Sequence, residues 1–216
     1  MCRTLRRLVS VARSERIRGG EDGQTLVEFA MVFPLMMILL MGIIEFSLAF
    51  NAVLGVDRAS ENGVLVASEA GNSLNADCLI LQEVDNKLTA PNSDASISTV
   101  QIQRTNASGV TILAADIWTR GGSTACTFND NTPPFSVPYT ATSLGYPDSQ
   151  RCAVLTGCSA LSPARSTVDT IGVQVRYTYT WRTPLSSLLT MIGGNGSGGG
   201  GWTFNKRNVM RIEPVL

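Results

Sequence analysis

Histidine is absent from this chain of 216 residues, and charged residues make up only 16% of it. Serine and cysteine triads with an imidazole base, histidine proton shuttles and most zinc sites are therefore excluded. Hydrophobic residues, in contrast, reach 44%. A chain of this length and composition has room for one membrane helix and one globular domain of ordinary size, and we expect no second full domain.

A formal net charge of zero conceals an uneven distribution of charge along the chain. The first 23 residues hold six arginines against three acids, whereas the remainder holds eleven basic and fourteen acidic residues. Nucleic-acid binding depends on a basic surface that neutralises phosphates and releases counterions. Because the surplus positive charge lies in the N-terminal segment, we expect no nucleic-acid partner.

An uncharged apolar run, FAMVFPLMMILLMGII, occupies residues 29–44 between Glu28 and Glu45. At about 1.5 Å per residue, the stretch between the two glutamates spans about 26 Å, close to the ~30 Å hydrocarbon core of a bilayer. We therefore predict a long helix over residues 24–72 that spans the membrane at about 26–50. The arginine-rich flank is expected to stay on the cytoplasmic side, which makes the rest of the chain extracytoplasmic.

Pro34 lies within the apolar run, where it removes one backbone hydrogen bond and favours a kink. Membrane helices tolerate proline, so we expect the helix to continue through it. The alternative interpretation of an arginine-rich start followed by an apolar core is a cleaved secretory signal. That alternative is disfavoured because the apolar core is too long and starts late, and because no convincing A-x-A site follows it.

The junction between the basic segment and the apolar run reads GQTLVEF from Gly23 to Phe29. A glycine with a glutamate five positions later, at the start of an apolar helix, resembles a type IV prepilin processing site. The resemblance implies cleavage after Gly23 by a prepilin peptidase at the cytoplasmic face, with Gln24 as the new amino terminus. Residues 1–23 are accordingly predicted to be a basic leader that is removed.

The same segment is similar to the TadE-like family, the minor pilins or pseudopilins of the tight-adherence type IVb pilus system. The family pattern has a glycine, a Val-Glu-Phe-Ala stretch, a proline a few residues later and a glycine-aliphatic-glutamate-aromatic exit. Here these elements are Gly23, VEFA at 27–30, Pro34 and GIIEF at 42–46. The resemblance implies a single-pass protein of the bacterial inner membrane that takes part in pilus assembly. Its implied partners are other pilin subunits, the assembly platform and the prepilin peptidase.

The resemblance also gives Glu28, Phe29, Pro34 and Glu45 a part in helix packing during assembly. An isolated carboxylate at the depth of Glu28 is unfavourable in a low-dielectric environment unless it is paired. The α-amine of a cleaved Gln24 supplies such a counter-charge, on its own chain or a neighbouring one. The alternative is an interfacial glutamate that reaches water or stabilises the helix N-terminus. For Glu45 we expect an interfacial position, with a partner contact as the alternative.

Beyond the membrane, we expect residues 73–216 to form a pilin-like α+β domain with an antiparallel sheet. Gly71 is expected to end the long helix, and a second helix is predicted over 75–88. Small residues at spacings of three and four predict a helix face that docks on the domain's own sheet rather than on a neighbouring subunit. This face consists of Val56, Ala59, Gly63, Val66 and Ala70.

Alternating β-branched and polar residues predict strands at 96–104, 109–120 and 170–181. A last strand over 202–215 is expected to return to the sheet edge. Residues 121–167 are rich in Pro, Gly, Ser and Cys and are expected to be irregular, and 184–192 is predicted to be a short helix before a glycine-rich loop. The strand at 170–181 alternates most clearly, with one face formed by Ile171, Val173, Val175, Tyr177, Tyr179 and Trp181.

Four cysteines follow the apolar run and one precedes it, a division that fits an oxidising and a reducing side of the membrane. We expect one or two disulfides that hold the irregular segment in place. Three pairings are possible, and the sequence does not choose among them. A zinc site is the alternative, disfavoured because the paired C-x-x-C spacing is missing. The four residues are Cys78, Cys126, Cys152 and Cys158.

The sequence offers no residue set for catalysis, so we expect neither an enzyme nor a cofactor, a metal or a small-molecule substrate. Four aspartates could suggest a tethered hydrolase, but they have no motif context and are interpreted as solvated loop or turn residues. They are Asp116, Asp130, Asp148 and Asp169. The alternative function is a membrane-tethered binding or adhesin domain that never enters a filament.

Overall fold

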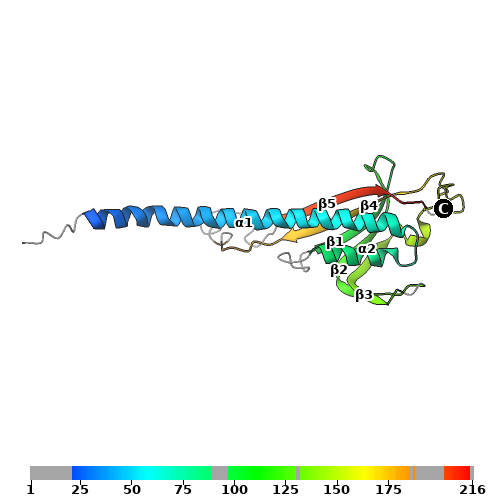
Figure 1. Ribbon diagram of the computed structural model, residues 1–216, viewed down its shortest axis with the longest axis horizontal. Coiled ribbons are helices and arrows are strands. Elements are labelled where there is room, and N and C mark those ends of the chain that lie inside the picture. Colours follow the sequence, from blue (N-terminus) through cyan, green and yellow to red (C-terminus); the bar gives the residue numbers. More distant parts are fainter. Residues whose placement is uncertain (1–20, 89–96, 130–131, 185–186, 188–201, 215–216) are drawn as a thin grey trace, which may run out of the picture. The chain divides into compact units, whose positions relative to one another are not determined.

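The computed structural model describes residues 21–88, 97–129, 132–184, 187 and 202–214. It confirms the predicted α+β class, in which a long apolar helix precedes an antiparallel sheet (Figure 1). The chain divides into two compact units, one ending at Ile43 and the other running from Ile44 to Leu216. The helices are α1 (Glu21–Ala70) and α2 (Ala76–Lys87), with a short 3-10 turn, η2, at Asp148–Gln150. The strands are β1 (Ile97–Thr105), β2 (Ile112–Cys126), β3 (Phe135–Leu144), β4 (Thr170–Tyr179) and β5 (Trp202–Arg211).

The helix α1 continues through Pro34, as expected for an apolar helix whose side chains favour helical backbone. It ends at Ala70 because Gly71 adopts a left-handed conformation, with φ of +52°. The N–H of Gly71 donates to the carbonyl of Ala67 at 3.3 Å, which satisfies one of the carbonyls left open at the helix end. The predicted stop at Gly71 is therefore confirmed.

The sheet has the strand order β3-β2-β1-β4-β5, and every neighbouring pair is antiparallel. The strand β5 pairs with β4 from Thr170–Arg211 to Tyr179–Trp202 and forms one edge, which confirms its predicted return to the sheet edge. The alternation in β4 is also confirmed, because Ile171, Val173, Val175, Tyr177 and Tyr179 are all buried. Trp181 lies beyond the strand and is half-buried.

The prediction that residues 121–167 are irregular is wrong at two places. The strand β2 runs on to Cys126, and Phe135–Leu144 forms β3 at the other edge of the sheet. Pro138 is tolerated in β3 because an edge strand needs only one row of ladder hydrogen bonds, and because Pro138 falls where the register with β2 shifts. The segment after β3 has the 3-10 turn η2 and isolated turns, as its composition predicted.

The C-terminal half of α1 packs on α2 and β4 through its small residues. A Cβ added at Gly63 would lie 2.8 Å from Cγ2 of Val84 and 3.2 Å from Cγ1 of Val173, so the close approach needs glycine. The hydroxyl of Ser60 donates to the carbonyl of Val173 at 2.7 Å and accepts from the N–H of Asn208 at 3.0 Å. Docking of the helix on its own sheet is thus confirmed.

The buried face of α1 follows the prediction at Val56, Ala59 and Gly63. Beyond Gly63 it differs, because Val64 and Ala67 are buried whereas Val66 and Ala70 are half-buried. Positions three and four apart both lie near one face of a helix, so the spacing alone does not decide which of them turns inward.

Candidate functional site

The first turns of α1 carry the residues of the predicted processing and assembly site. Residues 1–20 of the predicted leader lie outside the described part of the chain, whereas Gly23, Gln24 and Glu28 lie within α1. The side-chain amide of Gln24 donates to Oε1 of Glu28 at 3.0 Å. Side chains on a helix lean toward its N-terminus, and Glu28 therefore reaches back by one turn to the residue that follows the predicted cut.

The helix surface from Leu26 to Ile44 is apolar and open. Its large hydrophobic side chains are exposed by 36–76%, except that Met41 is half-buried. The ring of Phe29 lies beside that of Phe33, with centroids 5.4 Å apart, and Pro34 follows directly. This is one helix long and apolar enough to cross a membrane, and none of its most apolar stretch is buried within the chain.

Glu45 marks the point where α1 enters the domain. Its carboxylate is buried and accepts three hydrogen bonds, from the Tyr179 hydroxyl at 2.6 Å and from the N–H groups of Arg182 at 3.0 Å and Thr183 at 2.8 Å. Burial, together with the bond to Glu45, raises the pKa of Tyr179, so the phenol stays protonated as a donor. Glu45 therefore has hydrogen-bond donors within its own chain, and its contact with a partner subunit stays a prediction.

A second group of charges lies inside the domain and was missed by the sequence analysis. Arg151 forms an ion pair with Asp77 of α2, and its Nη2 lies 3.7 Å from Oδ2 of Asp116 in β2. The indole N–H of Trp118 donates to Asp77 at 3.0 Å, and the N–H of Tyr146 donates to Asp116 at 2.6 Å. The guanidinium of Arg151 also stacks over the Tyr146 ring, 5.2 Å from its centroid. We call Asp77, Asp116 and Arg151 the buried charge cluster.

The prediction that Asp116 is a solvated loop residue is wrong, because its side chain is fully buried in β2. The missed signal is strand alternation, which places Asp116 on the same inward face as Trp118. Asp169 is likewise buried, and its Oδ2 accepts from the Tyr146 hydroxyl at 2.8 Å, the Cys152 N–H at 3.0 Å and Nη1 of Arg165 at 2.7 Å.

The other two aspartates have different outcomes. Asp148 does lie in a turn, but it is half-buried rather than solvated, and it accepts the N–H of Asn75 at 2.7 Å. This bond ties η2 to the start of α2. Asp130 lies outside the described residues.

The four cysteines that follow the apolar run form two disulfides, Cys78–Cys126 and Cys152–Cys158. The first joins α2 to the end of β2, and the second closes a short loop after η2. Each begins next to a member of the buried charge cluster, since Cys78 follows Asp77 and Cys152 follows Arg151. The Cys78–Cys126 disulfide therefore ties α2 to the sheet, and the Arg151–Asp77 ion pair ties the irregular segment after β3 to α2.

Burial raises the pKa of Asp116 from 3.8 to about 7. The hydrogen bond from the N–H of Tyr146 has the opposite effect and lowers this pKa. Asp77 raises this pKa further and Arg151 lowers it. A raised folded-state pKa stabilises the fold at low pH, and this stability is lost as pH rises from about 4 through about 7.

Asp116→Asn should remove this loss. Relative to the unchanged chain, we expect the variant to gain about 2 kcal/mol in free energy of unfolding between about pH 5 and about pH 8. Urea unfolding of the full chain in detergent micelles, followed by near-UV circular dichroism, measures the difference. The control Asp57→Asn changes an exposed carboxylate on α1. Equal pH slopes for the two variants would contradict the prediction.

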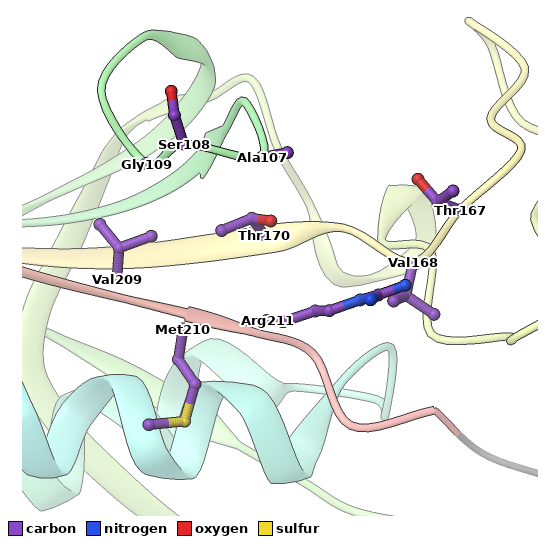
Figure 2. A pocket seen from close by; sticks show the side chains of 9 residues that line it. All are labelled: Ala107, Ser108, Gly109, Thr167, Val168, Thr170, Val209, Met210 and Arg211. Atoms are coloured by element: carbon purple, nitrogen blue, oxygen red, sulfur yellow. The ribbon is translucent and has the colours of Figure 1, made fainter.

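A shallow hollow of about 430 Å³ lies where the β1–β2 turn meets the start of β4 and the end of β5 (Figure 2). Small and apolar side chains form most of its lining, and Arg211 is the one charged residue among them. The side chains in Figure 2 do not converge on a common point, so the hollow presents no arrangement for acid–base or nucleophilic chemistry. Among the described residues, no group of three or more Cys, Asp or Glu is placed to hold a metal ion.

Residues 23–65 match the family model described as TadE-like protein, which confirms the resemblance inferred from the sequence. The match covers the Gln24–Glu28 turn, the open apolar surface and Glu45, and it ends before α2 and the sheet. No curated protein and no solved structure matches the chain.

Proposed function

We propose that this chain, whose N-terminal helix carries the TadE-like signature, is a minor pilin-like protein of a tight-adherence pilus system. In this proposal α1 anchors the protein in the bacterial inner membrane, with its N-terminus in the cytoplasm and its domain on the extracytoplasmic side. The protein is a structural component rather than an enzyme. Its partners are other pilin subunits, the assembly platform and the prepilin peptidase.

The observation that carries the proposal is the open apolar surface of α1 around a single carboxylate. Among the described residues, no cation lies within ion-pair distance of Glu28, whereas Glu45 is satisfied inside its own domain. An uncompensated carboxylate in an apolar surface favours a partner that brings positive charge. Packing against other apolar helices would cover the surface and bring such a partner close.

Cleavage after Gly23 supplies that partner. The new α-amine would stand on Gln24, the residue that Glu28 already contacts, so little rearrangement is needed for pairing within one chain. The same amine on a neighbouring subunit satisfies Glu28 only when the two helices have the matching stagger. Buried ion pairs can set register in this way, and the pairing would thus align subunits during assembly.

Glu28→Gln tests this role, because it removes the charge but keeps the shape and a hydrogen-bond acceptor for Gln24. We expect the amount of this protein in pili sheared from cells to fall about tenfold or more, as the loss of one partner of a buried pair predicts. Removal of the leader should be unaffected, so the intact mass should still equal that of a chain that begins at Gln24. Immunoblots of sheared and cell-bound fractions measure incorporation.

The control is Glu61→Gln, which changes an exposed glutamate further along the same helix and should leave incorporation unchanged. Normal incorporation of Glu28→Gln would contradict the ion-pair role. A native protein with the mass of a chain that begins at Met1 would contradict cleavage. If the unchanged, processed protein stays with cells while pili are sheared off, it is instead a membrane-tethered binding domain.

A further inference from the structure

Three aromatic side chains gather beside the buried carboxylate of Glu45. The ring centroids of Phe46 and Trp202 are 6.0 Å apart, and those of Trp181 and Trp202 are 5.2 Å apart. Phe46 is 65% exposed, Trp202 is 39% exposed and Trp181 is half-buried. We call these three residues the aromatic collar. It brings together α1, the end of β4 and the start of β5, because Trp202 pairs with Tyr179 in the sheet.

The position of the collar along α1 matches the thickness of a bilayer. Twenty helical steps separate Leu26 from Phe46. At about 1.5 Å per residue they span about 30 Å, which is the thickness of the hydrocarbon core. If Leu26 lies at the cytoplasmic boundary of the core, Phe46 lies at the opposite boundary.

The chemistry of the collar suits that boundary. Tryptophan is enriched at membrane–water interfaces because its ring is apolar while its N–H bonds to headgroups or water. The adjacent carboxylate of Glu45 would be unfavourable in hydrocarbon, but its three hydrogen bonds withdraw it into the domain. A lipid surface can therefore meet this rim of the domain without burying an unsatisfied charge.

We propose that the aromatic collar seats the domain in the headgroup region of the outer leaflet of the membrane that α1 spans. The bound partner is the lipid interface, and the argument for it is the continuity of the collar with the apolar helix. The inference rests on the membrane anchoring in the proposed function and not on entry into a pilus. One consequence is that a subunit leaving the membrane for a filament must lift its aromatic rim out of the lipid interface.

The protein provides its own control, because Trp118 is the third tryptophan and is buried in the core, bonded to Asp77. Full-length variants that keep one tryptophan each, with the other two replaced by phenylalanine, are reconstituted into phosphatidylcholine vesicles. Lipids brominated near the headgroup end of the acyl chain quench fluorescence at the interface. We expect the bromolipid to quench a fraction of the fluorescence of Trp181 and of Trp202 that is about two or more times the fraction quenched for Trp118, because interfacial indoles lie close to the lipid.

The outcome also separates this inference from the proposed function. Carbonate extraction of the same vesicles reports whether the chain is an integral membrane protein. If the chain resists extraction but Trp181 and Trp202 are quenched no more than Trp118, the lipid contact of the collar is wrong and the membrane anchor stands. If those tryptophans are shielded from both bromolipid and aqueous acrylamide, another protein copy covers them and the lipid contact is also wrong. Release of the chain by carbonate overturns both proposals.

Discussion

Replacing Arg151 with methionine is expected to lower the free energy of unfolding by about 3–5 kcal/mol, the usual effect of removing one partner of a buried ion pair. Methionine fills a similar volume, but it leaves Asp77 without its cation and removes the charge that lowers the pKa of Asp116. Each carboxylate keeps one neutral donor, the indole of Trp118 or the N–H of Tyr146. These donors do not replace a full charge, so the loss should approach the upper part of that range. Urea unfolding of the full chain in detergent micelles gives the value.

The matched control is Arg176→Met, because Arg176 lies on β4 with an exposed side chain. It should change the free energy of unfolding by no more than about 0.5 kcal/mol, the range usual for surface positions. If the two arginine variants lose similar stability, the charges of the buried cluster contribute little and packing around Tyr146 holds the region instead.

Removing the Cys78–Cys126 disulfide by replacing both cysteines with alanine should reduce the free energy of unfolding by about 4 kcal/mol, whereas removing Cys152–Cys158 should reduce it by about 2 kcal/mol. The difference follows from the loops they close, since the paired residues are 48 and 6 positions apart. A longer loop loses more conformational entropy in the unfolded chain when its ends are joined. Chemical unfolding of both double variants beside the unchanged chain measures the two losses.

Comparison of the two disulfide variants is informative because both bonds begin beside the buried charge cluster. Each double variant disturbs that neighbourhood, and the difference between them isolates the effect of loop length. A larger loss for Cys152–Cys158 would show that the short bond acts mainly by positioning Arg151, its neighbour in sequence, and that chain entropy is the smaller effect.

Local patterns in the sequence predicted the elements that are regular and the contacts that are close along the chain. The helix α2 was predicted at 75–88 and lies at Ala76–Lys87. The inward face of β4 followed from strict alternation, and Gly71 ended α1 because left-handed backbone suits glycine. The family resemblance also came from a compact motif, with its special residues in order within one helix.

The strand β3 escaped prediction because its sequence, FSVPYTATSL, contains a proline and many hydroxyl residues. It forms because β2 offers it a template, and because the edge position leaves Pro138 without a required ladder bond. Such a strand depends on its neighbour rather than on its own composition, and local propensity does not report it.

The buried charge cluster could not be predicted, because Asp77, Asp116 and Arg151 come from three distant parts of the chain. The packing of α2 and of the segment after η2 against β2 brings them together. Alternation in β2 did hint that Asp116 points inward with Trp118, but no sequence signal names Arg151 as its counter-charge. Glu45 is similar, since its donors lie at the end of β4 and just after it, more than 130 residues later in the chain.

The hydrogen bonds of Ser60 and Glu45 have a mechanical consequence. Ser60 joins α1 to both β4 and β5, and Glu45 joins α1 to the segment after β4. The rest of the domain is therefore attached to α1 at two points, which are about 23 Å apart along the axis of an α-helix. A sheet held at two such points cannot rotate about the segment of α1 between Glu45 and Ser60. Twisting of this segment must therefore turn the sheet by the same angle.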